Sequence, residues 1–63
     1  MGYLIKEARE EANMTQEELA EKAGVSRSII NGLETGRATE TLASTLQKIA
    51  EAMGKKIDDI FYN

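Results

Sequence analysis

The chain has 63 residues and contains neither Cys nor His, which excludes disulfides, zinc sites built on Cys and His, and His-dependent catalysis. Its formal net charge at pH 7 is −3, whereas nucleic-acid-binding domains are usually basic. No apolar run approaches the roughly 18 residues of a membrane-spanning helix, and the N-terminus lacks the apolar core of a signal peptide. We therefore expect one soluble, cytoplasmic domain over residues 1–63, with no membrane contact.

Two helices are predicted in the first third of the chain. The first spans about 3–12 and carries one apolar stripe. That stripe consists of Leu4, Ile5, Ala8 and Ala12. The second helix begins at Thr15, because Thr15 followed by Glu18 has the spacing of a capping box, and it ends at Gly24. Its inner face holds Leu19, Ala20 and Ala23.

Three further helices are predicted in the remainder. The third begins at Ser26, an N-cap residue, and ends at Gly36. The fourth spans about 41–53 and the fifth about 57–61. The inward residues are Ile30 and Leu33 in the third helix, Leu42, Leu46, Ile49, Ala50 and Met53 in the fourth, and Ile57, Ile60 and Phe61 in the fifth. The pattern predicts an all-α fold, a compact bundle of five short helices.

The stretch 16–35 has the features of a helix-turn-helix. Its two helices are separated by only a few residues around Gly24 and Val25, so they must cross at a steep angle. The crossing requires a small side chain, which Ala20 supplies. The turn requires a residue that tolerates positive φ, which Gly24 supplies.

As a set, these motifs resemble the phage repressor and Cro type of helix-turn-helix domain, also termed Xre-like or lambda-repressor-like. The matching segments are Thr15–Ala20, Gly24–Ser28, Ile30, Leu33–Glu34, Gly36, Leu46–Gly54 and Ile57–Phe61. The resemblance implies a small transcriptional regulator, most often a repressor, that binds double-stranded DNA sequence-specifically. In this family the second helix of the motif, here about 26–35, enters the major groove.

The resemblance also implies individual contacts. Arg27 and Ser28 would face base edges, and Arg27 suits a bidentate contact to guanine. Gln16 begins the preceding helix, where free backbone N–H groups and the helix dipole favour a phosphate, and its side-chain amide would add a further donor to that phosphate. The predicted DNA-binding residues are Gln16, Ser26, Arg27, Ser28, Asn31, Arg37 and Thr39. Local charge favours this surface, because residues 22–39 contain three cationic side chains and one carboxylate, Glu34.

Three positions, Asn31, Gly32 and Ile29, depart from the usual family pattern. Asn31 would read adenine if it points into the groove. Gly32 in a helix interior costs about 1 kcal/mol relative to Ala, and it either lets the backbone approach DNA or is simply tolerated. Ile29 is predicted on the outer side of the helix, against a thymine methyl or a protein partner.

The chain is expected to form a homodimer on a palindromic operator, with half-sites about 34 Å apart. The predicted dimer contact is Ile60, Phe61 and Tyr62. No catalytic, metal or cofactor motif is recognisable, so we expect no enzyme activity. The alternative is a protein-interaction module, such as an antitoxin or accessory subunit of the same fold. Its acidic first helix and Ile29 would then meet a partner, and binding to DNA would be absent.

Overall fold

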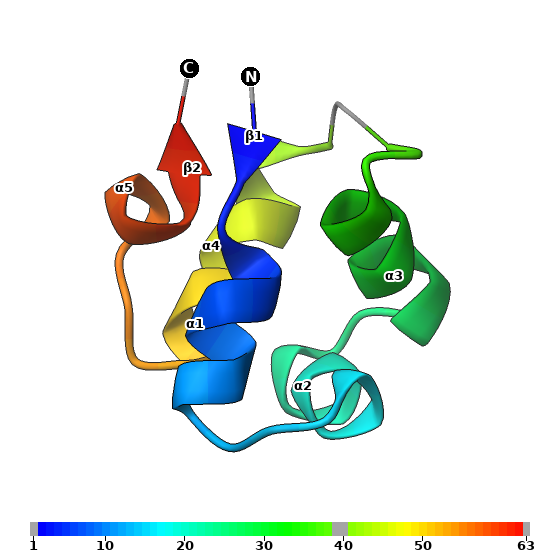
Figure 1. The fold of residues 1–63 in the computed structure, drawn as a ribbon, viewed down its shortest axis with the longest axis vertical. Coiled ribbons are helices and arrows are strands. Elements are labelled where there is room, and N and C mark those ends of the chain that lie inside the picture. Colours follow the sequence, from blue (N-terminus) through cyan, green and yellow to red (C-terminus); the bar gives the residue numbers. More distant parts are fainter. Residues whose placement is uncertain (1, 39–40, 63) are drawn as a thin grey trace.

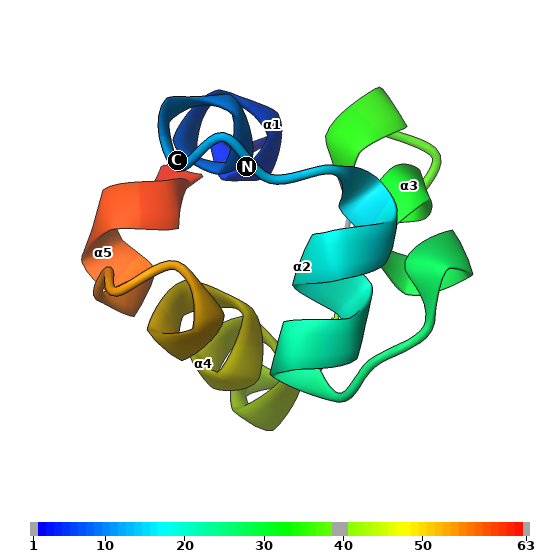
Figure 2. The same cartoon turned by 90° about the horizontal axis from the view of Figure 1, so that it is seen from below.

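The computed structural model describes residues 2–38 and 41–62, and in these ranges it contains the five helices that the sequence predicts (Figure 1). The elements are β1 (Gly2–Tyr3), α1 (Ile5–Glu11), α2 (Gln16–Ala23), α3 (Arg27–Thr35), α4 (Ala43–Ala52), α5 (Ile57–Ile60) and β2 (Phe61–Tyr62). The helices surround one core, with α3 and α5 on opposite sides of the molecule (Figures 1 and 2). Among the described residues, no helix combines the length and apolarity needed to cross a membrane.

The predicted helix boundaries around the second and third helices are confirmed. The Thr15 hydroxyl accepts a hydrogen bond from the Glu18 backbone N–H at 3.0 Å, and the Glu18 carboxylate accepts one from the Thr15 N–H at 2.9 Å. This reciprocal capping box satisfies two backbone donors at the start of α2. Ser26 caps α3 by accepting a hydrogen bond from the Ile29 N–H at 3.3 Å.

The two ends of the described chain pair as a short antiparallel ladder, which the sequence did not predict. Tyr3 pairs with Phe61, and the Leu4 N–H donates to the Ile60 carbonyl oxygen at 2.7 Å. The predicted first and fifth helices were therefore too long, because Tyr3 and Phe61 lie in strands. The Tyr3 and Phe61 rings pack with their centroids 5.6 Å apart.

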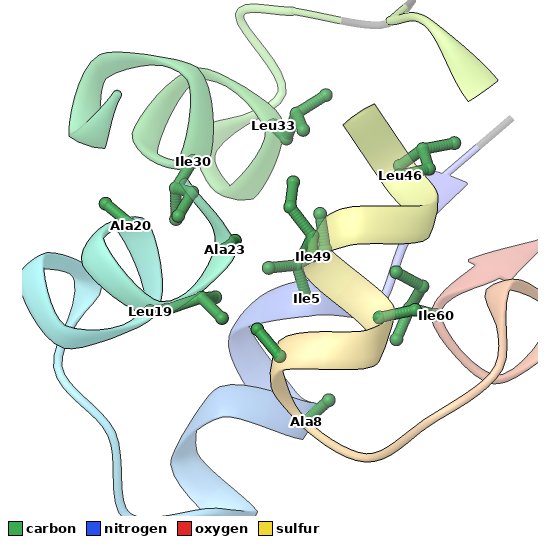
Figure 3. Packing of buried hydrophobic residues seen from close by; sticks show 12 residues of the cluster. Ile5, Ala8, Leu19, Ala20, Ala23, Ile30, Leu33, Leu46, Ile49 and Ile60 are labelled. Carbon is green, nitrogen blue, oxygen red and sulfur yellow. The ribbon is translucent and has the colours of Figure 1, made fainter. Parts of the chain in front are cut away.

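Every helix contributes one large side chain that is fully buried in the core (Figure 3). These side chains are Ile5, Leu19, Ile30, Ile49 and Ile60, in chain order. Each buried side chain of this size contributes about 1.5–3 kcal/mol through removal of apolar surface from water. Because the core joins all five helices in this way, none of them is packed independently of the others.

Three residues predicted on inner faces are exposed instead. Leu42 is 72% exposed and Leu4 is 38% exposed, and Ala12 is also exposed. All three are helix-flanking residues: Leu4 and Leu42 precede α1 and α4, and Ala12 follows α1. The prediction continues the apolar repeat of each helix across its cap residues. At a cap the backbone is no longer helical, so the side chain no longer points to the same side as the inner face of the helix.

A bidentate ion pair joins α1 to α3. Arg9 Nε donates to Glu34 Oε2 at 2.8 Å, and a second guanidinium nitrogen donates to Glu34 Oε1 at 3.0 Å. A third nitrogen of Arg9 donates to the Met14 carbonyl oxygen at 2.8 Å, in the connection between α1 and α2. The Glu34 side chain is only 3% exposed, so the pair is shielded from solvent.

Removal of the cation from this pair should destabilise the fold strongly. Arg9→Met leaves the Glu34 carboxylate buried without a counter-charge, and we expect a loss of about 3–5 kcal/mol in the free energy of unfolding. Urea unfolding followed by circular dichroism measures this loss.

Lys55→Met provides the matched control. Lys55 lies 3.5 Å from Glu11, whose side chain is 75% exposed, so we expect a change within about 0.5 kcal/mol. The double variant Arg9→Met/Glu34→Leu should recover part of the loss, because it removes the unpaired charge. Equal losses in Arg9→Met and Lys55→Met would contradict the prediction.

Candidate nucleic-acid interface

The turn between α2 and α3 is built as the sequence predicts. Gly24 adopts the left-handed conformation, with φ of 72°, and it ends α2. The Val25 N–H then donates to the Ala20 carbonyl oxygen at 3.0 Å, which closes the end of the helix. Ala20 and Ile30 are both buried, so the two helices pack directly against each other. This geometry fixes α3 relative to α2 and presents its other face to solvent.

The exposed face of α3 carries the polar residues predicted to read DNA. Ile30 and Leu33 point into the core, whereas Arg27 and Ser28 are exposed and Asn31 is half-buried. Ile29 is 40% exposed, which confirms its predicted position on the outer side of the helix. The helix is therefore strongly amphipathic and has one free face.

Five of the seven predicted DNA-binding residues line one open hollow of about 590 Å³. The hollow is lined by Gln16, Arg27, Ser28, Asn31, Gly32, Arg37 and Ala38. It brings together the start of α2, the first two turns of α3 and the loop after Gly36. Arg27 and Arg37 are cationic, and none of the described residues that line the hollow is a carboxylate. The local charge of this surface is positive although the chain as a whole is acidic.

The two remaining predicted residues are Ser26 and Thr39. Ser26 is the N-cap of α3 and does not line the hollow. Thr39 lies outside the described residues.

Gly32 has a packing role in the protein itself. It is buried, and a Cβ at this position would lie 3.3 Å from the Cβ of Ala38. The Ala38 N–H also donates to the Gly32 carbonyl oxygen at 3.0 Å. The missing side chain therefore admits the returning loop, and this contact explains Gly32 without any approach of DNA.

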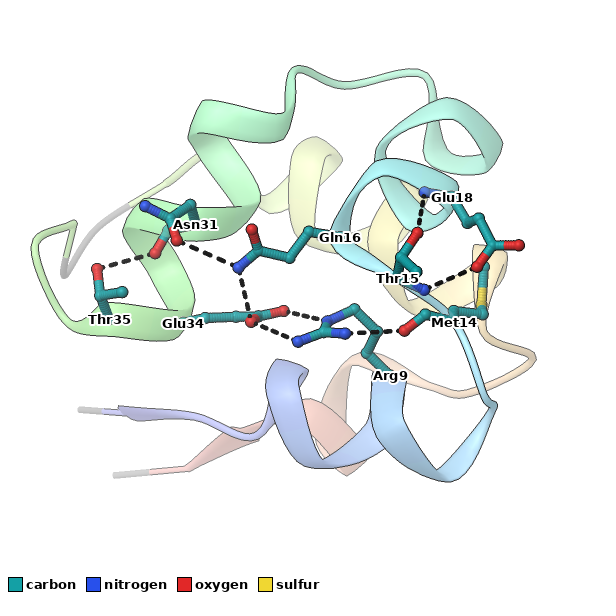
Figure 4. Close-up of polar contacts among 8 residues, drawn as sticks. All are labelled: Arg9, Met14, Thr15, Gln16, Glu18, Asn31, Glu34 and Thr35. Atoms are coloured by element: carbon teal, nitrogen blue, oxygen red, sulfur yellow. Dashed lines mark hydrogen bonds and ion pairs between the residues drawn. The ribbon is translucent and has the colours of Figure 1, made fainter.

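A chain of hydrogen bonds connects α1 to the hollow (Figure 4). Gln16 Nε2 donates to Glu34 Oε1 at 3.0 Å and to Asn31 Oδ1 at 3.2 Å. Glu34 in turn accepts both hydrogen bonds from Arg9. The amide hydrogens of Gln16, which the sequence analysis assigned to a phosphate, are thus used inside the protein. The remaining polar atom of the Gln16 side chain is Oε1.

The ion pair perturbs the ionisation of both partners. Burial raises the pKa of Glu34, but the hydrogen bonds from Arg9 and Gln16 and the nearby positive charges outweigh burial, so the net pKa lies below the usual value. The hydrogen bond to Glu34 raises the pKa of Arg9 further above its usual value, against a smaller opposing effect of burial. Both groups are therefore charged at neutral pH.

Sequence reasoning assigned no role to Arg9 or Glu34. A signal for Glu34 was nevertheless present, because a carboxylate in the last turn of a helix is unfavourable next to the negative end of the helix dipole. Such a residue indicates a compensating cation. The sequence did not identify which cation, since Arg9 lies 25 positions away on another helix.

The predicted dimer contact is only partly compatible with the structure. Ile60 is 0% exposed and belongs to the protein's own core, so its side chain is not available to a partner. Phe61 is half-buried beside Tyr3. The side chain of Tyr62 lies outside the described part of the chain.

The ionised state of Glu34 should contribute to stability in a defined pH range. A carboxyl group with a lowered pKa in the folded state stabilises the protein above its unfolded pKa, and this contribution is lost as pH falls through the folded value. We expect the free energy of unfolding to decrease as pH is lowered below about 4.3, the ordinary value for Glu.

Glu34→Gln should show a smaller decrease over the same range, and the exposed-site control Glu11→Gln should behave as the unchanged protein does. Chemical unfolding at a series of pH values measures these slopes. A Glu34→Gln profile that is parallel to that of the unchanged protein would show that the ionisation of Glu34 is not coupled to folding.

Comparison with known proteins is consistent with this geometry. A family model described as helix-turn-helix matches residues 5–60. The chain is 48% identical over 62 residues to an uncharacterized HTH-type transcriptional regulator of Methanothermobacter thermautotrophicus, covering 97% of this chain and 88% of that protein. It is 49% identical over 61 residues to one of Archaeoglobus fulgidus, covering 97% of this chain and 84% of that protein.

A phage protein is also similar. The chain is 42% identical over 60 residues to the immunity repressor protein of Bacillus phage phi105. The alignment covers 95% of this chain and 41% of the repressor. The similarity therefore concerns one part of that longer protein.

Proposed function

Because the chain belongs to the helix-turn-helix family, we propose that it binds double-stranded DNA sequence-specifically, with α3 in the major groove, as a small transcriptional regulator. The observation that carries the proposal is the hollow along the first turns of α3, in which Arg27, Ser28 and Asn31 gather beside Arg37. Their side chains supply hydrogen-bond donors on a cationic surface, which is what base edges and phosphates require.

Arg27 is the principal base-reading residue in this proposal. It is the first residue of α3 and is exposed, and within the described part of the chain the hollow that it borders is lined by no carboxylate. A guanidinium group in this position fits guanine O6 and N7, a contact worth about 1–3 kcal/mol of discrimination. Ser28 is its exposed neighbour and supplies a hydroxyl on a shorter side chain.

Phosphate contacts come from the ends of the motif. The capping box engages the backbone N–H groups of Thr15 and Glu18, which leaves those of Gln16 and Glu17 without a hydrogen bond inside the described ranges. These two donors at the positive end of α2 suit a phosphate oxygen. Gln16 thus contributes its backbone N–H in place of the side-chain amide. Arg37 supplies a second phosphate contact after α3.

Repression by occupation of an operator is the simplest use of such a domain, and the similarity to the phage immunity repressor protein supports it. Binding to DNA also agrees with the cytoplasmic location expected from the sequence. The competing proposal, a protein-interaction module, has less support, because it gives no role to the cationic hollow.

DNA selection with an arginine variant tests the proposal. Purified protein is mixed with random duplex DNA at low and at physiological salt, and bound sequences are identified. We expect enrichment of one motif and an affinity that falls steeply with salt. Arg27→Ala should lose about 1–3 kcal/mol of discrimination at one base pair. Arg37→Ala should weaken binding to all sequences alike and lower the salt slope by about 1.

Lys48→Ala is the matched control, since Lys48 is an exposed cation on α4 and does not line the hollow. It should leave the selected motif unchanged. Weak binding that is indifferent to Arg27→Ala would exclude the DNA-reading role and favour a protein partner.

We also propose that two copies bind a palindromic operator. The contact between them is assigned to the end of the molecule where β1 and β2 pair, with Ile60 removed from the predicted surface and Phe61 retained. Sedimentation of the protein with its selected duplex should give two copies per duplex, and the motif should contain two half-sites about 34 Å apart. One copy on an asymmetric motif would exclude the dimer.

A further inference from the structure

A series of hydrogen bonds links Arg9 to Asn31 through Glu34 and Gln16, and in each of them the donor and the acceptor are fixed. The Arg9 guanidinium donates to Glu34, Glu34 accepts from Gln16, and Gln16 donates to Asn31. The four residues come from three helices, α1, α2 and α3, and their side chains meet where these helices face one another (Figure 4).

Glu34 determines which groups donate and which accept in this series. Its carboxylate is held ionised by the guanidinium, with contacts of 2.8 and 3.0 Å, and an ionised carboxylate only accepts hydrogen bonds. The amide of Gln16 must therefore turn its NH₂ group toward Glu34, since its oxygen would be repelled there. A carboxylate that is 3% exposed enforces this choice, because little water is present to compete.

The orientation of the Gln16 amide in turn determines the orientation of the Asn31 amide. Nε2 of Gln16 has two hydrogens, and the second is directed at Asn31. Because Nε2 only donates, the atom of Asn31 that faces it must be the oxygen. The Asn31 NH₂ group donates no hydrogen bond to any of the described residues, and its side chain lines the hollow.

We propose that Arg9, Glu34 and Gln16 are positioning residues that hold Asn31 with its NH₂ group toward DNA, so that Asn31 reads a base edge as a donor. This inference rests on the proposed DNA binding and names a specificity determinant within it. We call the four residues, Arg9, Glu34, Gln16 and Asn31, the amide relay.

The amide relay changes the base that Asn31 is expected to prefer. A bidentate contact to adenine uses the Asn oxygen as acceptor for N6 and the Asn NH₂ as donor to N7. With Oδ1 engaged by Gln16, the outward group is a donor, and guanine offers two acceptors, N7 and O6, on its major-groove edge. Asn31 should therefore favour guanine over adenine.

The base preference of a Gln16 variant tests the amide relay. Asn31→Ala first identifies the base pair that Asn31 reads, as the position whose preference it removes. The unchanged protein should prefer guanine to adenine there by about tenfold, the equivalent of 1.4 kcal/mol. Gln16→Met keeps the Arg9–Glu34 pair and frees the Asn31 amide to rotate. The preference should then fall below about twofold or shift to adenine.

Gln47→Met is the matched control. Gln47 also donates from Nε2 to a carboxylate, that of Glu51 at 3.0 Å, but on the exposed surface of α4. It should leave the base preference unchanged, and circular dichroism should show that both Met variants are folded. A purely structural role of Gln16 would lower affinity for all sequences without changing the preference at one base pair.

Failure of the amide relay and failure of the proposed DNA binding give different results. If the unchanged protein prefers adenine at this position, or if Gln16→Met leaves the preference unaltered, the amide relay is overturned while DNA binding stands. If the unchanged protein shows no salt-sensitive binding to any duplex, the proposed function fails and the inference fails with it.

The amide relay is also visible without DNA. In the free protein, the side-chain NH₂ of Gln16 should exchange with water more slowly than that of Asn31, as measured by NMR of the side-chain amides. Equal exchange at both residues would contradict the assigned orientation.

Discussion

The largely buried ion pair between the Arg9 and Glu34 side chains, which are 12% and 3% exposed, is the constraint on which the arrangement of this small molecule depends. The core alone joins the five helices by apolar packing, which is non-directional and tolerates small rotations of a helix. The two parallel hydrogen bonds of the ion pair are directional, and they fix the rotation of α3 relative to α1. The third hydrogen bond, to the Met14 carbonyl oxygen, fixes the entry into α2 as well. One arginine therefore orients both helices of the motif.

The location of this pair connects stability to recognition. A buried ion pair does not stabilise a protein more than good apolar packing would, because the desolvation of both charges offsets their attraction. What an apolar replacement would lack is a preference for one orientation of Gln16. Glu34 satisfies Arg9 with both oxygens and still accepts from Gln16 through Oε1. The same carboxylate thus holds the scaffold and sets the direction of the hydrogen bonds at the surface of the hollow.

The sequence predicted the features that are encoded locally, and it failed where partners are distant. Thr15 with Glu18, and Ser26 at its own helix start, are local capping signals, and the structure has both. The pairing of Tyr3 with Phe61 is invisible to periodicity, because two-residue strands have no repeat to detect. Gly32 was interpreted as letting the backbone approach DNA or as merely tolerated, whereas the structure shows it in contact with Ala38 in the loop after α3. The residues lining the hollow were predictable because the family pattern fixes their helical phase. Their hydrogen bonds to one another were not.

The acidic net charge has a consequence for how such a domain would read DNA. Glu18, Glu21 and Glu51 line a different hollow, between α2 and the end of α4, which shares no residue with the cationic one. The molecule spans 25 × 21 × 19 Å along its principal axes, and salt screens charges beyond about 8 Å at physiological ionic strength. Carboxylates that lie farther than this from the cationic hollow therefore oppose DNA binding mainly at low salt. Since Arg27 and Arg37 are the only cations among the described residues that line that hollow, we expect few counterions to be released on binding and a low non-specific affinity. Base contacts must then carry a larger share of the affinity than in a basic domain, which makes the orientation of a single amide such as Asn31 matter for the choice of site.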